Sequence, residues 1–139
     1  MPVRTANAEW KGSLKEGSGH MRFQSGAFDG AYSYLSRFES GAGTNPEELI
    51  TAAHAGCYSM QLSGLLTAAG TPPANIKTTA KVEIIAGTGI TNIALETVAH
   101  VPGIDDKAFH EAAEKARQIC PVSKALSAVP ITLRAKLAK

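Results

Sequence analysis

Apolar and polar residues alternate along the first part of the chain, between Val3 and Phe38. Three stretches carry the alternation, ANAEWKGSL, GHMRFQSGAF and AYSYLSRFE, and glycines interrupt them. Alternation with a period of two is typical of half-buried β-strands. We therefore predict two or three antiparallel strands here, followed by a loop at Gly41, Gly43 and Thr44.

The segment from Asn45 to Ala69 predicts a long helix. Asn45 is a favourable N-cap, Pro46 suits the first helical position, and Gly70 supplies the stop. Such a helix of about 24 residues would be ~36 Å long. Because its faces are small or apolar nearly all round, we expect it to be buried at the centre of the fold.

The second half of the chain predicts a hairpin, two helices and a final strand. The runs KTTAKVEIIAG and GITNIALETVAHV alternate and would turn near residues 87–89. Asp105 or Asp106 begins a helix, and Cys120 followed by Pro121 resembles the start of a shorter one. The run ITLRAKL then alternates as a closing strand. This mixture predicts an α+β domain.

Length and composition agree with one folded domain over residues 1–139, of which 44% are hydrophobic. The net charge is only +2, and no run of five basic residues occurs, so nucleic acid is not an expected partner. The N-terminus lacks the apolar stretch of a secretory signal. The apolar segment at 49–69 carries polar residues that favour a core helix over a membrane span. We therefore expect a cytoplasmic protein.

Two cysteines, Cys57 and Cys120, are too few for a disulfide-rich scaffold or for a zinc site of cysteines alone. Cys57 falls near the middle of the long helix, where a buried inert thiol is the simpler interpretation and a thiolate would need a cation beside it. Cys120 falls at a helix start, where free backbone N–H groups favour the thiolate form. The residues alone leave both interpretations open.

Three polar residues accompany the thiols. His54 lies one helical turn before Cys57 and could be a base, a proton shuttle, a metal ligand or a packed, hydrogen-bonded residue. Arg37 lies in the aromatic run YSYLSRFES. It could be a surface residue of a strand, or its guanidinium could pair with a carboxylate. Glu47 precedes Cys57 by ten positions, ~15 Å along a helix, so one site for both needs a bridging arginine or a second protomer.

The run GTNPEELITAAHAGCYSM, with Cys120 in ICPVSKAL, resembles the OsmC/Ohr family of thiol-dependent hydroperoxide reductases. The likeness covers the whole chain, from AEWKGSL through ITNIALETVAHVPGID to the final ITL strand. The AAHAGC run and SRFE resemble the OsmC branch. The first hairpin region, EWKGSLKEGSGH, has no arginine, so Arg37 is the position that matches the arginine of the OsmC type. The sequence departs from the family pattern at Gly56 and Tyr58, where alanine and phenylalanine are usual.

This resemblance implies an OsmC-like α+β fold, with antiparallel sheets around a long central helix, in an intertwined homodimer. It implies that Cys57 is the peroxidatic cysteine and Cys120 the resolving cysteine, which together form a disulfide. Arg37 would stabilise the thiolate and orient the peroxide, and Glu47 would hold Arg37. Whether Arg37 and Glu47 serve the Cys57 of their own chain or of the partner stays open.

The implied activity is a peroxiredoxin-type reduction of organic hydroperoxides, and less efficiently of hydrogen peroxide, in the response to oxidative or osmotic stress. It needs no cofactor or metal and uses an external dithiol, plausibly of lipoyl type. One alternative is a non-catalytic stress protein that binds an apolar ligand at the dimer interface, against which both intact cysteines argue. Another is a protein disulfide oxidoreductase, but that class usually has a short C-x-x-C spacing, whereas these cysteines are 63 positions apart.

Overall fold

The structure, a computed structural model, describes all 139 residues. The chain packs as two compact units, Met1–Leu49 and Ile50–Lys139. The first unit contains β1 (Ala6–Lys11), β2 (Ser18–Phe23), β3 (Asp29–Tyr32) and α1 (Tyr34–Phe38). The long helix α2 (Pro46–Ala68) begins in the first unit and continues into the second. A single domain over the whole chain stays a prediction.

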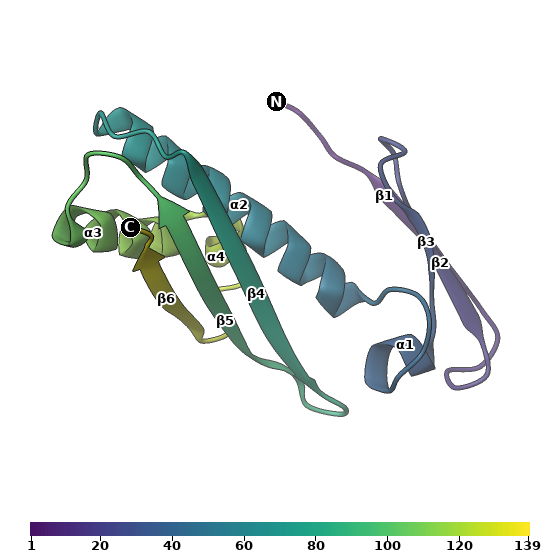
Figure 1. Cartoon of the computed structure of the whole chain (residues 1–139). Helices are drawn as coiled ribbons and strands as arrows, with labels where there is room; N and C mark the ends of the chain where they lie inside the picture. The colour runs from purple at the N-terminus through teal and green to yellow at the C-terminus, as the bar shows by residue number, and fades with distance from the viewer. The chain divides into compact units, whose positions relative to one another are not determined.

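The first unit is built on an antiparallel meander in the order β1-β2-β3 (Figure 1). Trp10 of β1 and Tyr32 of β3 pack across β2 with ring centroids 5.4 Å apart. Gly19 lies beneath them, and a Cβ added there would come within 2.6 Å of both rings. Only glycine therefore lets the two aromatic side chains meet over the middle strand.

The predicted third strand is correct only in its first half. Strand β3 ends at Tyr32, and the residues that follow form the short helix α1 instead of continuing the alternation. Ser33 and Ser36 explain the change, because each side chain accepts a hydrogen bond from the other residue's backbone N–H, at 3.1 and 2.8 Å. This reciprocal capping box starts a helix. Arg37 therefore lies on a helix and not on a strand.

The second unit combines α2 with a three-stranded sheet and two further helices. Its other elements are β4 (Asn75–Ile85), β5 (Gly89–His100), α3 (Asp106–Ile119), α4 (Pro121–Ala125) and β6 (Ile131–Leu137). The α+β class and the predicted order of elements are confirmed. One detail differs, because β6 pairs parallel to β5 while β4 pairs antiparallel to it. Helices α3 and α4 form the crossover that a parallel pair requires.

The core of the second unit lies between one face of this sheet and the helices α2 and α3 (Figure 1). Alternate residues of β5 point into it, and α3 adds an apolar stripe; the buried residues are Leu95, Ala99, Phe109, Ala113 and Ala116. From α2 only one side enters the core, through Tyr58, Leu62 and Leu66. The expectation that α2 is buried all round is therefore wrong for the single chain, where Met60 is 80% exposed.

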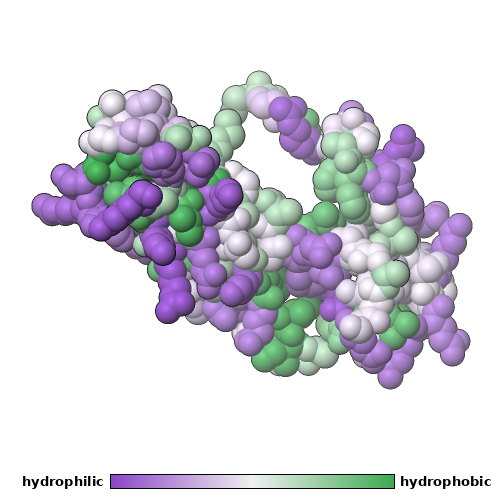
Figure 2. Space-filling view, in the orientation of Figure 1, coloured by the Kyte–Doolittle hydropathy of each residue, from purple (hydrophilic) through white to green (hydrophobic).

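Hydrophobic residues show on the surface over the tip of the β4–β5 hairpin (Figure 2). Ile85, beside that tip, is 48% exposed. None of the helices is both long enough and apolar enough to span a membrane.

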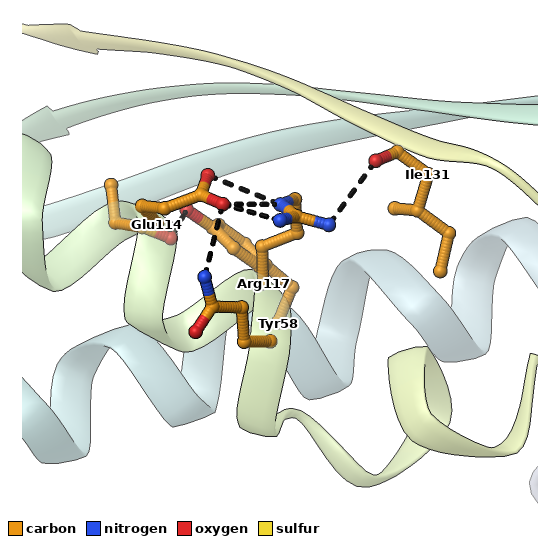
Figure 3. Close-up of polar contacts among 6 residues, drawn as sticks. Tyr58, Glu114, Arg117 and Ile131 are labelled. Carbon is orange, nitrogen blue, oxygen red and sulfur yellow. Dashed lines mark hydrogen bonds and ion pairs between the residues drawn. The ribbon is translucent and has the colours of Figure 1, made fainter. Parts of the chain in front are cut away.

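A polar cluster ties the end of α3 to the start of β6 (Figure 3). Arg117 binds the Glu114 carboxylate through Nε at 3.0 and 3.1 Å and through Nη2, and its Nη1 donates to the carbonyl of Ile131 at 3.3 Å. Beside it, the buried Tyr58 hydroxyl donates to the carbonyl of Ala113 at 3.0 Å. The hydroxyl group that tyrosine adds relative to the usual phenylalanine is therefore hydrogen-bonded. Because Arg117 lies three residues before Cys120, this cluster fixes the corner that carries the cysteine.

We predict that Glu114→Gln lowers the stability of the protein at neutral pH but not in acid. The hydrogen bonds from Arg117 hold the pKa of the Glu114 carboxyl below its ordinary value of 4.5. The resulting stabilisation is therefore fully present above pH 4.5 and is lost as the pH falls through the lowered pKa. Since the pair is half exposed, the loss should be about 0.5–1 kcal/mol at pH 7, measured by urea unfolding across pH.

A matched control is Glu111→Gln, because Glu111 pairs with Lys107 at 3.6 Å with both side chains mostly exposed. This variant should unfold like the unchanged protein at every pH. An equal loss for Glu114→Gln at pH 7 and at pH 3 would show that the ion pair is not its cause.

Candidate active site

The two thiols meet in the core of the second unit. Cys57 lies midway along α2. Cys120 is both the C-cap of α3 and the N-cap of α4. Their Sγ atoms are 2.9 Å apart, with the Cys120 thiol donating to Cys57, and both cysteines are free. Cys120 is fully buried and Cys57 half-buried. Two residues 63 positions apart are thus placed for direct sulfur–sulfur chemistry.

The immediate surroundings of Cys57 do not favour its thiolate. Burial raises the pKa of Cys57, and the neighbouring Cys120 thiol raises it further. A hydrogen bond from the backbone of Val122 acts in the opposite direction and lowers this pKa. No cationic side chain is among these causes. A reactive Cys57 therefore needs a positive charge from elsewhere.

Arg37 and Glu47 form a close ion pair in the first unit. Nε of Arg37 lies 3.1 and 3.2 Å from the two carboxylate oxygens, and Nη2 lies 2.7 Å from Oε1. Glu47 is buried in the first turn of α2, while the Arg37 side chain is 38% exposed. Two guanidinium nitrogens are thus held by Glu47, and Nη1 has no partner in the chain. The pair has the geometry to present this remaining donor to an anion or a polar oxygen.

An apolar cavity of about 250 Å³ adjoins Arg37. Its walls are mainly aromatic and come from both the sheet and α1: Trp10, Leu14, Tyr32, Ser33, Tyr34, Arg37 and Phe38. The Arg37 guanidinium also lies over the ring of Phe38, with its Cζ 5.1 Å from the centroid. A cationic hydrogen-bond donor at the edge of an apolar hollow suits a ligand with a polar head and an apolar body.

His54 is fully buried and contacts α4. Its Nε2 lies 2.7 Å from Oγ of Ser123, which is itself 4% exposed. Nδ1 is buried with no hydrogen-bond partner, and burial lowers the pKa of the imidazole, which favours its neutral form. Of the roles left open for His54, the packed, hydrogen-bonded one describes this arrangement. No group of three or more His, Cys, Asp or Glu side chains is placed to bind a metal ion.

The structure brings the four predicted site residues together as two pairs, Cys57 with Cys120 and Arg37 with Glu47. The two pairs belong to different compact units. Two further features escape the sequence pattern. Ser123 lies in the run PVSKA, which carries no recognisable motif. The aromatic cavity is lined by residues from four segments of the chain. Both features become visible only in the tertiary structure.

Comparison with known proteins gives a consistent result. Residues 39–134 match a family model described as "OsmC-like protein". The chain is 46% identical over 129 residues to the "Peroxiredoxin OsmC" of Escherichia coli strain K12, which covers 90% of both proteins. The corresponding protein of Shigella flexneri is also 46% identical.

Solved structures share the fold across nearly the whole chain. An OsmC-like protein from Mycoplasma pneumoniae superposes with a TM-score of 0.76 at 16% identity, covering 99% of each chain. An organic hydroperoxide resistance protein from Elizabethkingia anophelis gives a TM-score of 0.67 at 25% identity, covering 99% of this chain and 98% of the other. Taken with the matched family model and the 46% identity over nine-tenths of the sequence, these likenesses show that the chain belongs to the OsmC family.

Proposed function

We propose that this protein is a thiol-dependent peroxidase that reduces organic hydroperoxides to alcohols. The observation that carries the proposal is the 2.9 Å separation of the Cys57 and Cys120 sulfur atoms. The peroxiredoxin and hydroperoxide-resistance names of its relatives support the same class of reaction. Hydrogen peroxide would be a poorer substrate than a hydroperoxide with an apolar body.

In the first step, the Cys57 thiolate attacks the distal oxygen of the hydroperoxide. The O–O bond breaks, the alkoxide takes a proton and leaves as the alcohol, and Cys57 becomes a sulfenic acid. Arg37 supplies the positive charge that Cys57 lacks in its own surroundings, and its free Nη1 donates to the peroxide as negative charge develops. Glu47 orients the guanidinium for this task.

In the second step, the sulfur of Cys120 attacks the sulfur of Cys57. The S–O bond breaks, hydroxide leaves and takes the Cys120 proton as water, and a Cys57–Cys120 disulfide forms. An external dithiol then reduces the disulfide and is itself oxidised to a disulfide. A lipoyl-type dithiol is our proposed reductant, and the cycle requires neither a metal nor an organic cofactor.

The aromatic cavity beside Arg37 is the proposed place for the substrate's apolar body. Large apolar residues of α2 do not supply its walls, because Leu62 and Leu66 are buried in the core of the second unit and Met60 is exposed. Aromatic side chains of the first unit supply the apolar walls instead. The exposed side of α2 around Met60 also supports a homodimer as the working unit, with Arg37 serving Cys57 of its own chain or of the partner.

We predict that Cys57→Ser abolishes peroxide consumption, because the attacking sulfur is lost. Cys120→Ser should allow one rapid oxidation of each Cys57 and then stall, since no intramolecular disulfide can form. The assay follows consumption of cumene hydroperoxide, and of hydrogen peroxide in parallel, with dihydrolipoic acid as reductant. Cumene hydroperoxide should be the better substrate.

Full turnover by Cys57→Ser would overturn the proposed function. A protein that consumes no peroxide with any dithiol, yet binds apolar ligands in both cysteine variants, would instead be the non-catalytic binding protein.

We predict that Arg37→Ala raises the pKa of Cys57, because a nearby positive charge favours the thiolate. The rate of peroxide reduction should fall by roughly 10²–10³, as for other lost donors to developing negative charge. The pKa is measured from the pH dependence of iodoacetamide alkylation, in a Cys120→Ser background so that one thiol reports.

Arg37→Lys serves as the matched control, because it keeps the charge but loses the two-nitrogen contact to Glu47. It should retain a lower Cys57 pKa than Arg37→Ala while still reducing peroxide slowly. An alkylation profile that is identical in all three proteins would remove Arg37 from the mechanism.

A further inference from the structure

A second contact between α2 and α4 runs beside the two thiols. His54 lies one helical turn before Cys57 on α2, and Ser123 lies one turn after Cys120 at the start of α4. The His54–Ser123 hydrogen bond, at 2.7 Å, therefore joins the same two segments as the Cys57–Cys120 contact, at 2.9 Å. We propose that His54 and Ser123 are positioning residues, which hold Cys120 where it can attack the oxidised sulfur of Cys57.

Helix α4 needs such a tie because it has little stability of its own. It contains five residues, and its N-cap, Cys120, makes no side-chain capping hydrogen bond. Isolated helices below ~12–15 residues are marginal in water, so packing must hold this one in place. On the other side of Cys120, Arg117 is already fixed by Glu114 and by the Ile131 carbonyl. Ser123 supplies the corresponding anchor after the cysteine.

The state of His54 indicates that its bond to Ser123 has a purpose beyond filling space. The ring is fully buried, yet Nδ1 has no partner, so Ser123 is its single polar contact. Buried polar atoms without a partner are rare because they cost free energy, and an apolar side chain would fill the same volume without this cost. What the imidazole adds is a directional bond to a specific atom on α4.

The pair should matter for one chemical step and not for the other. Formation of the sulfenic acid involves Cys57 and the peroxide, whereas formation of the disulfide also requires the sulfur of Cys120 in line with the S–O bond that breaks. When the disulfide forms slowly, a second peroxide molecule oxidises the sulfenic acid to sulfinic acid, which dithiols do not reduce. The His54–Ser123 bond thus favours recycling over irreversible oxidation. This inference rests on the proposed function.

The experiment compares Ser123→Ala with Ser123→Thr, which keeps the hydroxyl, and with Ser127→Ala, which removes an exposed hydroxyl one turn further on. Stopped-flow measurements of sulfenic acid and disulfide formation with cumene hydroperoxide separate the two steps. We expect Ser123→Ala to form sulfenic acid at the unchanged rate, to form the disulfide on the order of 10- to 100-fold more slowly, and to accumulate more sulfinic acid by mass spectrometry. Ser127→Ala should match the unchanged protein, and Ser123→Thr should recover much of the rate.

Because Ser123→Ala leaves the buried His54 without a partner, this variant could fail to fold. The double variant His54→Leu/Ser123→Ala replaces both groups by apolar ones and should fold, since neither polar partner is left alone. It should show the same slow second step with a normal first step. Disulfide formation at the unchanged rate in the folded double variant would overturn the positioning role. That result, with Cys57→Ser still inactive, would leave the proposed function intact, whereas turnover by Cys57→Ser would refute the function itself.

Discussion

The packing of α2 and α3 against one face of the β4-β5-β6 sheet is the constraint on which the site depends. Tyr58, Leu62 and Leu66 bury one side of α2 against the apolar stripe of α3. Cys120 belongs to this core and Cys57 packs against it, so the burial of apolar surface that stabilises the unit also brings the two sulfurs together.

Burial has an opposite effect on the chemistry of Cys57. The apolar surroundings that position the thiol also raise its pKa, and the neighbouring Cys120 raises it further. A thiol peroxidase needs the thiolate, so the cost of forming it must be offset by a positive charge. In the proposed mechanism the Arg37–Glu47 pair supplies this charge; Glu47 is buried at the start of a helix and keeps two guanidinium nitrogens fixed while a third stays free.

Local sequence signals located most elements well, because capping and turn chemistry act over a few residues. Asn45 accepts a hydrogen bond from the backbone N–H of Glu48 at 2.7 Å, Asp105 accepts one from Ala108 at 2.7 Å, and Gly70 has the positive φ that ends α2. One such local signal overrides the alternation of apolar and polar residues. The Ser33–Ser36 capping box turns the aromatic run around Arg37 into a helix, although its alternation favours a strand.

The sequence by itself determined the family and the α+β class, and it singled out the two thiols, Arg37 and Glu47 as candidate site residues, since motifs and caps are local properties of the chain. Tertiary structure alone decided which face of α2 is buried, that β6 runs parallel to β5, and that His54 bonds Ser123. The aromatic cavity beside Arg37 belongs to this second group as well. All four depend on contacts between segments far apart in the chain. Such contacts depend on which apolar faces of the helices and strands pack against one another, and a local sequence pattern does not specify this choice.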